Sequence, residues 1–242
     1  EEFYTKTGLQ VVTPQNFDLW WEAHKDLQIS WATQEQFSGS GRYSAEAYRQ
    51  GLATLFPVDL RYGWDLTIKS HREKISRLQK HFQPLVKFSA PDCRNWTAMS
   101  NMFPDRERLA EERKLETPML EWLHQDNVQQ AKLGHGFVNE NGLRSQIWTQ
   151  SPLSRNYTIT NHRKIRVDGC AHGLVDTDNN PLEKAYRLDV NIAMRNTEKR
   201  CPGHGTRQHR KIAGYDLTAY TIVYTKQMVK QLIKDVAIFV NR

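Results

Sequence analysis

Two short polar segments carry the side chains best suited to covalent and proton-transfer chemistry. Cys93 stands beside Arg94 directly after an apolar run, and a cationic neighbour in a loop favours the nucleophilic thiolate. Glu140 and Asn141 follow a second apolar run, where a carboxylic acid can donate to a ring nitrogen and an amide can fix its position. Taken singly, Cys93 could also be an inert, half-buried thiol, and Asn141-Gly142 could be a simple turn.

A glycine-rich turn at residues 37–41, Phe-Ser-Gly-Ser-Gly, is the candidate ligand-binding loop. Phe37, Gly39 and Gly41 lie between an expected strand and an expected helix, where small residues let the backbone approach a ligand at a helix N-terminus. Asp59, at the end of the next expected strand, could accept hydrogen bonds from ribose hydroxyls, and Asp65 could lie nearer a base. The alternatives are a plain turn and two helix-capping aspartates.

These motifs need a sheet to position them, and the hydrophobic pattern predicts one. Strands are expected at 27–37, 54–60, 85–88 and 136–138, and helices at 45–52, 70–82 and 105–133, the last being one helix or two around Pro118. Alternating strands and helices indicate an α/β fold with a mostly parallel central sheet and crossover helices, in which ligands bind at the carboxyl ends of the strands. Each motif above falls at such an end.

The chain divides into four expected regions. Residues 1–30 form an N-terminal helical extension, and 31–150 form the core that carries the motifs. Residues 151–215 are rich in Asn, Asp, Arg and Gly and form an irregular basic insert. Residues 216–242 return to regular periodicity and predict a helix and a final strand that complete the core.

The order of these motifs resembles that of the cofactor, nucleophile and glutamate motifs of cytosine-C5 DNA methyltransferases. The motifs are, in order, the glycine turn, Asp59, Pro91-Asp92-Cys93 with Trp96-Thr97, and Glu140-Asn141-Gly142. The resemblance covers roughly residues 30 to 150 and is carried by the combination of motifs. It implies a Rossmann-like, S-adenosylmethionine-dependent methyltransferase fold.

The resemblance also implies roles for individual residues. Cys93 would attack C6 of a cytosine flipped from its stack, while Glu140 would protonate or hold N3 and Asn141 would assist it. S-adenosylmethionine would be the cofactor, and the residues expected around it are Phe37, Gly39, Gly41, Asp59, Asp65 and Pro91.

Three features depart from the family pattern. Asp92 stands where the family usually has a second proline, and a carboxylate there opposes thiolate formation. The later arginine-bearing motif is matched only by the basic run 162–166, and a recognisable target-reading domain is missing unless residues 151–215 replace it. An inactive nucleic-acid-binding or structural module of a ribonucleoprotein is therefore the alternative to an active enzyme. A thiol enzyme acting on a small substrate ranks last.

Cysteine and histidine gather in the irregular region. Cys170, His172, Cys201 and His204, with His209 nearby, have the residue types of a tetrahedral zinc site. Their irregular spacing also fits separate thiols and solvent-facing histidines. This tract resembles methyltransferase-like modules within retroelement polyproteins, which implies an origin in a longer chain.

The net charge of +7 favours a polyanionic partner, because each cation set against a phosphate releases condensed counterions. The alternative is a solvated basic face. The cations expected to contact DNA or RNA are Arg94, Arg163, Arg166, Arg207, Arg210 and Lys211.

Composition also bounds the class of protein. No run approaches the roughly 18 apolar residues of a membrane helix, and the acidic N-terminus lacks the pattern of a signal peptide. An odd count of three widely spaced cysteines suits reduced thiols better than disulfides. We therefore expect a soluble protein of an intracellular, reducing compartment, with nucleic acid and other chains of a larger complex as partners and no membrane contact.

Overall fold

The computed structural model describes residues 2–97, 99–102, 105–205, 208–212, 221 and 223–242. Its α-helices are α1 (Glu2–Thr7), α2 (Phe17–His24), α3 (Arg42–Arg49), α4 (Lys69–Phe82), α5 (Arg106–Lys132), α6 (Ile147–Gln150) and α8 (Lys226–Val240). Its strands are β1 (Thr33–Gln36), β2 (Val86–Ser89), β3 (Gly136–Gly142), β4 (Arg163–Asp168), β5 (Leu182–Glu183), β6 (Ala185–Val190) and β7 (Arg210–Lys211). Short 3-10 helices are η1 (Leu60–Tyr62), η2 (Arg94–Trp96), η3 (Met99–Met102), η4 (Pro152–Thr158) and η5 (Gly169–His172).

The central sheet has five strands in the order β1-β2-β3-β6-β4. β1, β2 and β3 pair in parallel, whereas β6 is antiparallel to both β3 and β4. β4 therefore points in the same direction as β1, β2 and β3, and β6 is the reversed strand among them. The protein is an α/β protein with a mixed sheet whose strands mostly run one way.

The strand expected at 54–60 is an extended segment that lies beside β1 without forming a regular ladder. It makes parallel bridges from Thr54 to Thr33 and from Val58 to Gln36. Pro57, between these bridges, has no N–H to donate, which explains the interrupted pairing.

This segment defines where the chain changes direction across the sheet. The chain leaves β1 through α3 to reach the extended segment on one side, and then passes through α4 to reach β2 on the other side of β1. In α/β sheets, ligands bind outside the carboxyl ends of the strands at such a switch point. The carboxyl ends of β1 and β2 are therefore the first place to look for a site.

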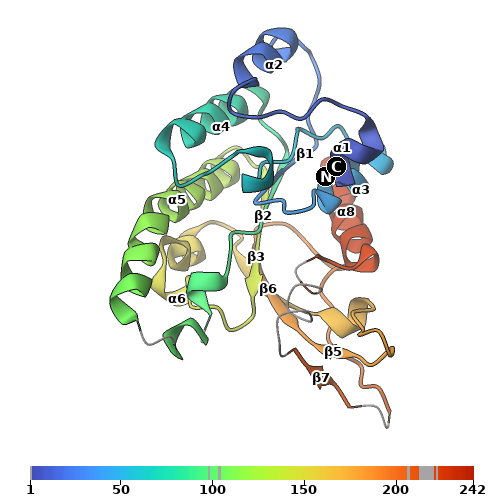
Figure 1. Ribbon diagram of the computed structural model, residues 1–242. Helices are drawn as coiled ribbons and strands as arrows, with labels where there is room; N and C mark the ends of the chain where they lie inside the picture. Colours follow the sequence, from blue (N-terminus) through green and yellow to red (C-terminus); the bar gives the residue numbers. More distant parts are fainter. Residues whose placement is uncertain (1, 98, 103–104, 206–207, 213–220, 222) are drawn as a thin grey trace.

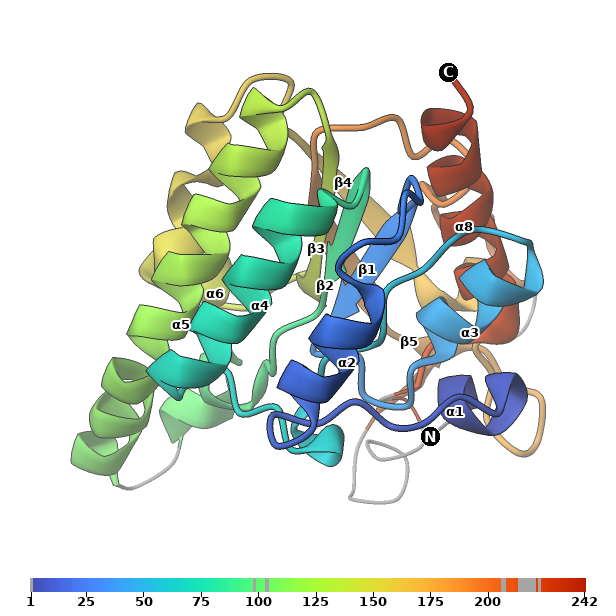
Figure 2. The same cartoon turned by 90° about the horizontal axis from the view of Figure 1, so that it is seen from above.

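Helices cover both faces of the sheet. α4 and α5 lie on one face, and α3 and α8 lie on the other (Figures 1 and 2). Two hydrophobic clusters correspond to these faces, one around α4, α5 and the N-terminal segment and one around α3, α8 and the strands.

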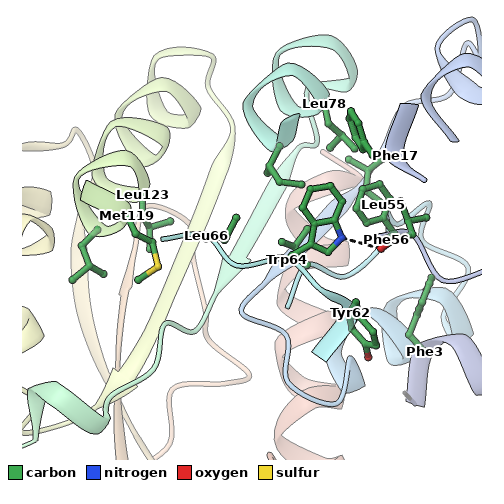
Figure 3. Packing of buried hydrophobic residues seen from close by; sticks show 14 of the residues in the cluster. Phe3, Phe17, Leu55, Phe56, Tyr62, Trp64, Leu66, Leu78, Met119 and Leu123 are labelled. Atoms are coloured by element: carbon green, nitrogen blue, oxygen red, sulfur yellow. Dashed lines mark hydrogen bonds between the residues drawn. The ribbon is translucent and has the colours of Figure 1, made fainter. Parts of the chain in front are cut away.

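The N-terminal segment is part of the first cluster. Phe17 and Trp64 pack edge to face with ring centroids 5.7 Å apart, and the Trp64 indole donates a 2.8 Å hydrogen bond to the carbonyl oxygen of Val12 (Figure 3). Phe3 and Tyr4 of α1 are buried in the same cluster. Part of the N-terminal segment thus packs against the domain, whereas Leu19, Leu27 and Ile29 are exposed.

One open choice is settled by the structure, and one expectation is wrong. α5 is a single helix that contains Pro118, which settles the choice between one helix and two. α8 continues to Val240, and the described residues after it form no strand. Val229, Leu232 and Val236 lie on its buried face, whereas Ile238 is 48% exposed, so the last apolar residues follow the helical period and not that of a strand.

Part of the region expected to be irregular belongs to the central sheet. β4 and β6 both come from residues 151–215 and complete the sheet beyond β3. The sequence of β4 has charged residues between its apolar ones, and so it shows no continuous apolar run from which a strand could be predicted. In the structure, Arg163 and Lys164 are exposed while Ile165 and Val167 are buried. No helix among the described residues is long and apolar enough to cross a membrane.

Candidate active site at the carboxyl edge of the sheet

The carboxyl ends of β2 and β3 bring the expected nucleophile and acid into one region. β3 continues three residues beyond the last residue of β2 that pairs with it, so Glu140 and Asn141 lie beside the segment that leads to Cys93. The buried Asn141 amide donates a 2.8 Å hydrogen bond from Nδ2 to the carbonyl oxygen of Pro91. Asn141 therefore holds the start of the Cys93 loop.

The other end of this loop is fixed to α5 and α6. Glu116 on α5 accepts hydrogen bonds from Asn95 Nδ2, at 2.8 Å, and from Trp96 Nε1, at 2.5 Å. The backbone N–H of Gln146 donates to the carbonyl oxygen of Trp96 at 2.6 Å. Cys93 is exposed, but the loop around it is anchored on both sides.

The electrostatic surroundings of Cys93 keep it protonated. Desolvation by the surrounding protein raises the pKa of the thiol, the negative charges of Asp92 and Glu140 raise it further, and Lys184 opposes them. Arg94 forms its ion pair with Asp92, at 3.5 Å, and not with the sulfur. The prediction that Arg94 favours the thiolate is therefore wrong, because Arg94 pairs with the carboxylate that acts against it.

Glu140 is a buried acid with two partners that the sequence did not reveal. Burial raises the pKa of Glu140, whereas a hydrogen bond from the Tyr224 hydroxyl and the charge of Lys184 lower it by less. Lys184 interacts electrostatically with both Glu140 and Cys93, and burial lowers its pKa. No pattern around Lys184 or Tyr224 signals a functional role, since they lie 44 and 84 residues beyond Glu140 and meet it only in the folded chain.

The glycine-rich turn has an unusual backbone. Phe37 has a φ of 54°, a left-handed conformation that bulky residues rarely adopt, and Gly39 and Gly41 have φ values of 53° and 70°. A Cβ at Gly41 would lie 3.2 Å from Phe3 Cβ, so this glycine packs against the protein. A Cβ at Gly39 would meet nothing within 4 Å, so Gly39 is the glycine that faces open space.

Asp59 shapes this turn. Its Oδ2 accepts a 2.7 Å hydrogen bond from the Gly39 N–H, and its Oδ1 accepts from the Arg61 N–H at 2.9 Å. The carboxylate thus joins the two loops and caps η1. Asp65 accepts hydrogen bonds from the N–H and hydroxyl of Thr67, in the turn before α4. It does not cap that helix, because the N-cap residue of α4 is Ile68 and no side chain caps it.

Glu35 on β1 is a buried acid that the sequence analysis missed. Its Oε2 accepts hydrogen bonds from the Ser44 N–H, at 2.9 Å, and the Ser44 hydroxyl, at 2.7 Å, within the first turn of α3. Burial is the main cause that raises its pKa, to about 8, and the charge of Asp59 adds to it. Glu35 therefore ties the start of α3 to β1, directly under the glycine turn.

Several polar atoms at this edge are buried without a hydrogen-bond partner among the described residues. They include Gln36 Nε2 and Ser38 Oγ at the end of β1, and both amide atoms of the Asn139 side chain on β3. Buried polar groups are normally paired, so each such atom calls for an explanation. A polar ligand at the end of β1 would supply partners for Gln36 and Ser38.

The expected nucleic-acid-contacting cations are spread over several places. Arg94 belongs to the Cys93 loop, and Arg163 on the edge strand β4 donates to the carbonyl oxygen of Ile192 at 2.7 Å. Arg166 pairs with Asp168 at 2.6 Å, and Arg210 pairs with Asp176 at 2.9 Å. Lys211 is exposed on β7, and Arg207 lies outside the described residues.

A cavity beside the Cys93 loop adds three cations that the sequence did not single out. Its volume is about 440 Å³, and Trp96 lines it together with Arg106, Arg113 and Lys114 of α5. Arg113 lies 5.1 Å from the centroid of the Trp96 ring. These cations gather on the α5 side of the Cys93 loop.

The cysteine and histidine cluster lies beyond the end of β4, and it contains His209 in place of the expected His172. Cys170, Cys201 and His204 come together with His209, and their ligand atoms lie within 4.8 Å of one another. His172 is not part of the group, because it is fully buried and its Nε2 lies 2.9 Å from the carbonyl oxygen of Thr197. The local turn of η5 directs His172 toward the core while Cys170 remains at the rim.

No protein-family model matches the chain, and a comparison with curated proteins found no match.

Proposed function

We propose that this protein is an S-adenosylmethionine-dependent, cytosine-C5 methyltransferase-like protein that acts on nucleic acid. The observation that carries the proposal is the meeting of Cys93, Glu140 and Asn141 at the ends of two adjacent parallel strands, next to the switch point of the sheet. The sheet, with most of its strands in one direction and helices on both faces, fits the Rossmann-like fold that the proposal requires.

Each residue would have a defined task. The Cys93 thiol, once deprotonated, would form a bond to C6 of a cytosine turned out of its stack, and the electron pair released to C5 would attack the methyl group of S-adenosylmethionine, whose bond to sulfur would break and leave the neutral thioether. Loss of the C5 proton and departure of the thiolate would then restore the ring. Glu140, whose raised pKa keeps a proton available, would donate to N3 and withdraw electrons from the ring. Tyr224 would keep the Glu140 carboxyl group in place.

The end of β1 has features that suit the cofactor. S-adenosylmethionine supplies a methyl group carried on a positively charged sulfur. Gly39 faces open space, and Ser38 Oγ and Gln36 Nε2 are buried polar atoms in need of partners. Asp59 would position the turn through Gly39, while Phe37 and Pro91 flank the ends of β1 and β2. These residues are the proposed cofactor-binding set, and Gly41 supports it by packing.

A second candidate function is supported by the surroundings of the thiol. Asp92 raises the pKa of Cys93 and also pairs with Arg94, so the resting nucleophile is protonated and lacks a nearby free cation from the loop. This observation favours a module that kept the fold and its basic surface and lost the chemistry. Such a module would bind nucleic acid through cations such as Arg106 and Lys114, with affinity that falls steeply with salt.

A covalent trap separates the two functions. Oligonucleotides in which 5-fluorocytosine replaces cytosine would be incubated with the protein and S-adenosylmethionine. After methyl transfer, fluorine cannot leave C5 as a proton does, so the bond between Cys93 and C6 would persist. We expect a denaturation-resistant complex on DNA or RNA that is lost in Cys93→Ser and strongly reduced in Glu140→Gln, but retained in Glu183→Gln, a change at a nearby exposed glutamate.

The same samples test methyl transfer directly. Labelled methyl groups should appear on cytosine at C5 in the wild-type reaction. Salt-sensitive binding of the oligonucleotide without an adduct or label, unchanged by Cys93→Ser, would overturn the enzymatic proposal in favour of the binding module.

A further inference from the structure

Four thiol and imidazole groups that are not among the side chains proposed for methyl transfer converge at the carboxyl end of β4. Cys201 Sγ lies 3.2 Å from His204 Nε2 and 3.4 Å from His209 Nε2. His209 Nε2 lies 3.2 Å from Cys170 Sγ. The group therefore joins the loop after β4 to a segment about 30 residues further along the chain.

The distances fit the coordination shell of one zinc ion. Zinc lies about 2.3 Å from sulfur and about 2.0 to 2.1 Å from nitrogen in tetrahedral sites, which places the ligand atoms roughly 3.3 to 3.8 Å apart. The three sulfur–nitrogen distances, 3.2 to 3.4 Å, are close to this range, and all four ligand atoms lie within 4.8 Å of one another. Two thiolates and two imidazoles are also the donors that zinc prefers, and a tetrahedral set of this composition favours zinc over harder cations.

The segment that supplies three of these ligands has little else to hold it. No described residue from 198 to 212 is buried, so this segment gains little from hydrophobic burial. Its remaining fixed points are polar, such as the Cys201 N–H that donates to Asp168 Oδ2 at 2.8 Å. Segments of this kind are commonly held by a metal or a disulfide.

The cluster also connects to the candidate active site through backbone hydrogen bonds. Next to His209, Arg210 of β7 pairs with Leu182 of β5, two residues before Lys184. On the other side, the Gly169 N–H, next to Cys170, donates to the carbonyl oxygen of Lys184 at 2.7 Å. The backbone of Lys184 is thus held directly from the Cys170 side of the cluster, and the two residues before it pair with β7 on the His209 side.

We propose that Cys170, Cys201, His204 and His209 bind a structural zinc ion that fastens residues 199–205 and 208–211 to the end of β4 and supports the position of Lys184. Four protein ligands fill the tetrahedral shell, so the ion has no open position for a substrate or water and acts on the fold alone. This inference does not depend on the proposed methyl transfer.

Metal analysis of the purified protein tests the site. We expect about one zinc ion per chain in wild type and a nearly complete loss in Cys201→Ser and in His209→Ala. His172→Gln and Cys93→Ser are matched controls that change a histidine and a thiol outside the group, and both should keep the metal. Retention of zinc in His209→Ala together with its loss in His172→Gln would overturn the proposed ligand set.

Two further measurements keep the proposal testable if a variant fails to fold. Cobalt added to metal-stripped wild-type protein should give the intense visible bands of four-coordinate cobalt and a thiolate-to-metal charge-transfer band. Removal of zinc should speed tryptic cleavage at Lys199, Arg200, Arg210 and Lys211, and zinc should restore protection, while cleavage within α5 stays unchanged. Absence of cobalt bands, a Cys170–Cys201 disulfide in freshly purified protein, or cleavage that chelation leaves unchanged would each contradict it.

Discussion

Asn141 Nδ2 donates a 2.8 Å hydrogen bond to the carbonyl oxygen of Pro91, which fixes the end of β3 to the loop that carries Cys93. Both residues are buried, so the carbonyl oxygen has no access to bulk water if the amide is removed. Together with the pairing of β2 and β3, this contact holds the proposed acid beside the loop of the proposed nucleophile.

Replacing Asn141 by Ala should therefore loosen the Cys93 loop. We expect a loss of about 1 to 3 kcal/mol in the free energy of unfolding, because a buried acceptor loses its partner. Amide exchange at residues 93–96 should accelerate as well. Asn191→Ala is the matched control, because Asn191 makes a comparable 2.8 Å bond to the carbonyl oxygen of His135 at the opposite end of β3. An equal effect of both variants on the exchange of residues 93–96 would contradict this role for Asn141.

Asp92 should control the reactivity of Cys93. Removing its negative charge in Asp92→Asn should lower the pKa of the thiol, whereas Lys184→Met should raise it, because Asp92 and Lys184 act on the sulfur with opposite signs. The rate of alkylation by iodoacetamide follows the thiolate fraction, so its pH profile should move to lower pH in the first variant and to higher pH in the second. Asp105→Asn, a change at the exposed N-cap of α5, should leave the profile in place. Identical profiles for all four proteins would show that these charges do not govern the thiol.

Glu35 should make the protein less stable as the pH rises from about 4.5 to about 8. Its pKa is raised from 4.5 to about 8 on folding, mainly by burial. In this interval the folded state holds a proton that the unfolded chain has released, so stability falls with rising pH. Each pKa unit between the two states corresponds to about 1.4 kcal/mol.

Thermal melting across this pH range measures the effect. Glu35→Gln keeps an acceptor for Ser44 and cannot ionise, so the difference in melting temperature between the variant and wild type should grow in favour of the variant toward pH 8. A constant difference at every pH would show that Glu35 ionises in the folded protein as it does in the unfolded chain.

The sequence predicted the positions of several helices and strands better than it predicted the contacts of the candidate site. The helix at 70–82 and the strands ending near Phe88 and Glu140 follow from apolar periodicity, and so their loops could be placed at strand ends. β1 was harder to define, because its four residues are polar and yet buried. Periodicity registers apolar side chains and does not register a buried Glu35 that is satisfied by Ser44.

Contacts between residues distant in the sequence could not be predicted, because they depend on the topology of the fold. Tyr224 meets Glu140 because α8 and the segment before it return to the sheet, and Lys184 meets it because β6 is inserted between β3 and β4. His209 replaces His172 in the cysteine and histidine cluster because the turn of η5 points His172 into the core. In each case the sequence shows which residue types are present, whereas only the fold shows which of them are in contact.

Gly39 and Gly51 offer a matched pair for testing the proposed cofactor site. Both have positive φ values, of 53° and 78°, and a Cβ at either would meet nothing within 4 Å. Gly39 lies in the turn after β1, whereas Gly51 follows α3, three residues before Thr54, which bridges to Thr33 at the start of β1. Asparagine tolerates a left-handed backbone better than other residues with side chains, so Gly39→Asn and Gly51→Asn should both fold.

Only Gly39→Asn should weaken the binding of S-adenosylmethionine, because its side chain would occupy the open space above the turn. Isothermal titration with the cofactor would measure a large loss of affinity for this variant and wild-type affinity for Gly51→Asn. Gly41 is a poorer choice for this test, since a Cβ there would lie 3.2 Å from Phe3 Cβ and could disturb the packing of the turn for reasons unrelated to a ligand. Equal affinities in the two asparagine variants would place the cofactor elsewhere, and no binding in wild type would leave a basic module without methyl-transfer chemistry.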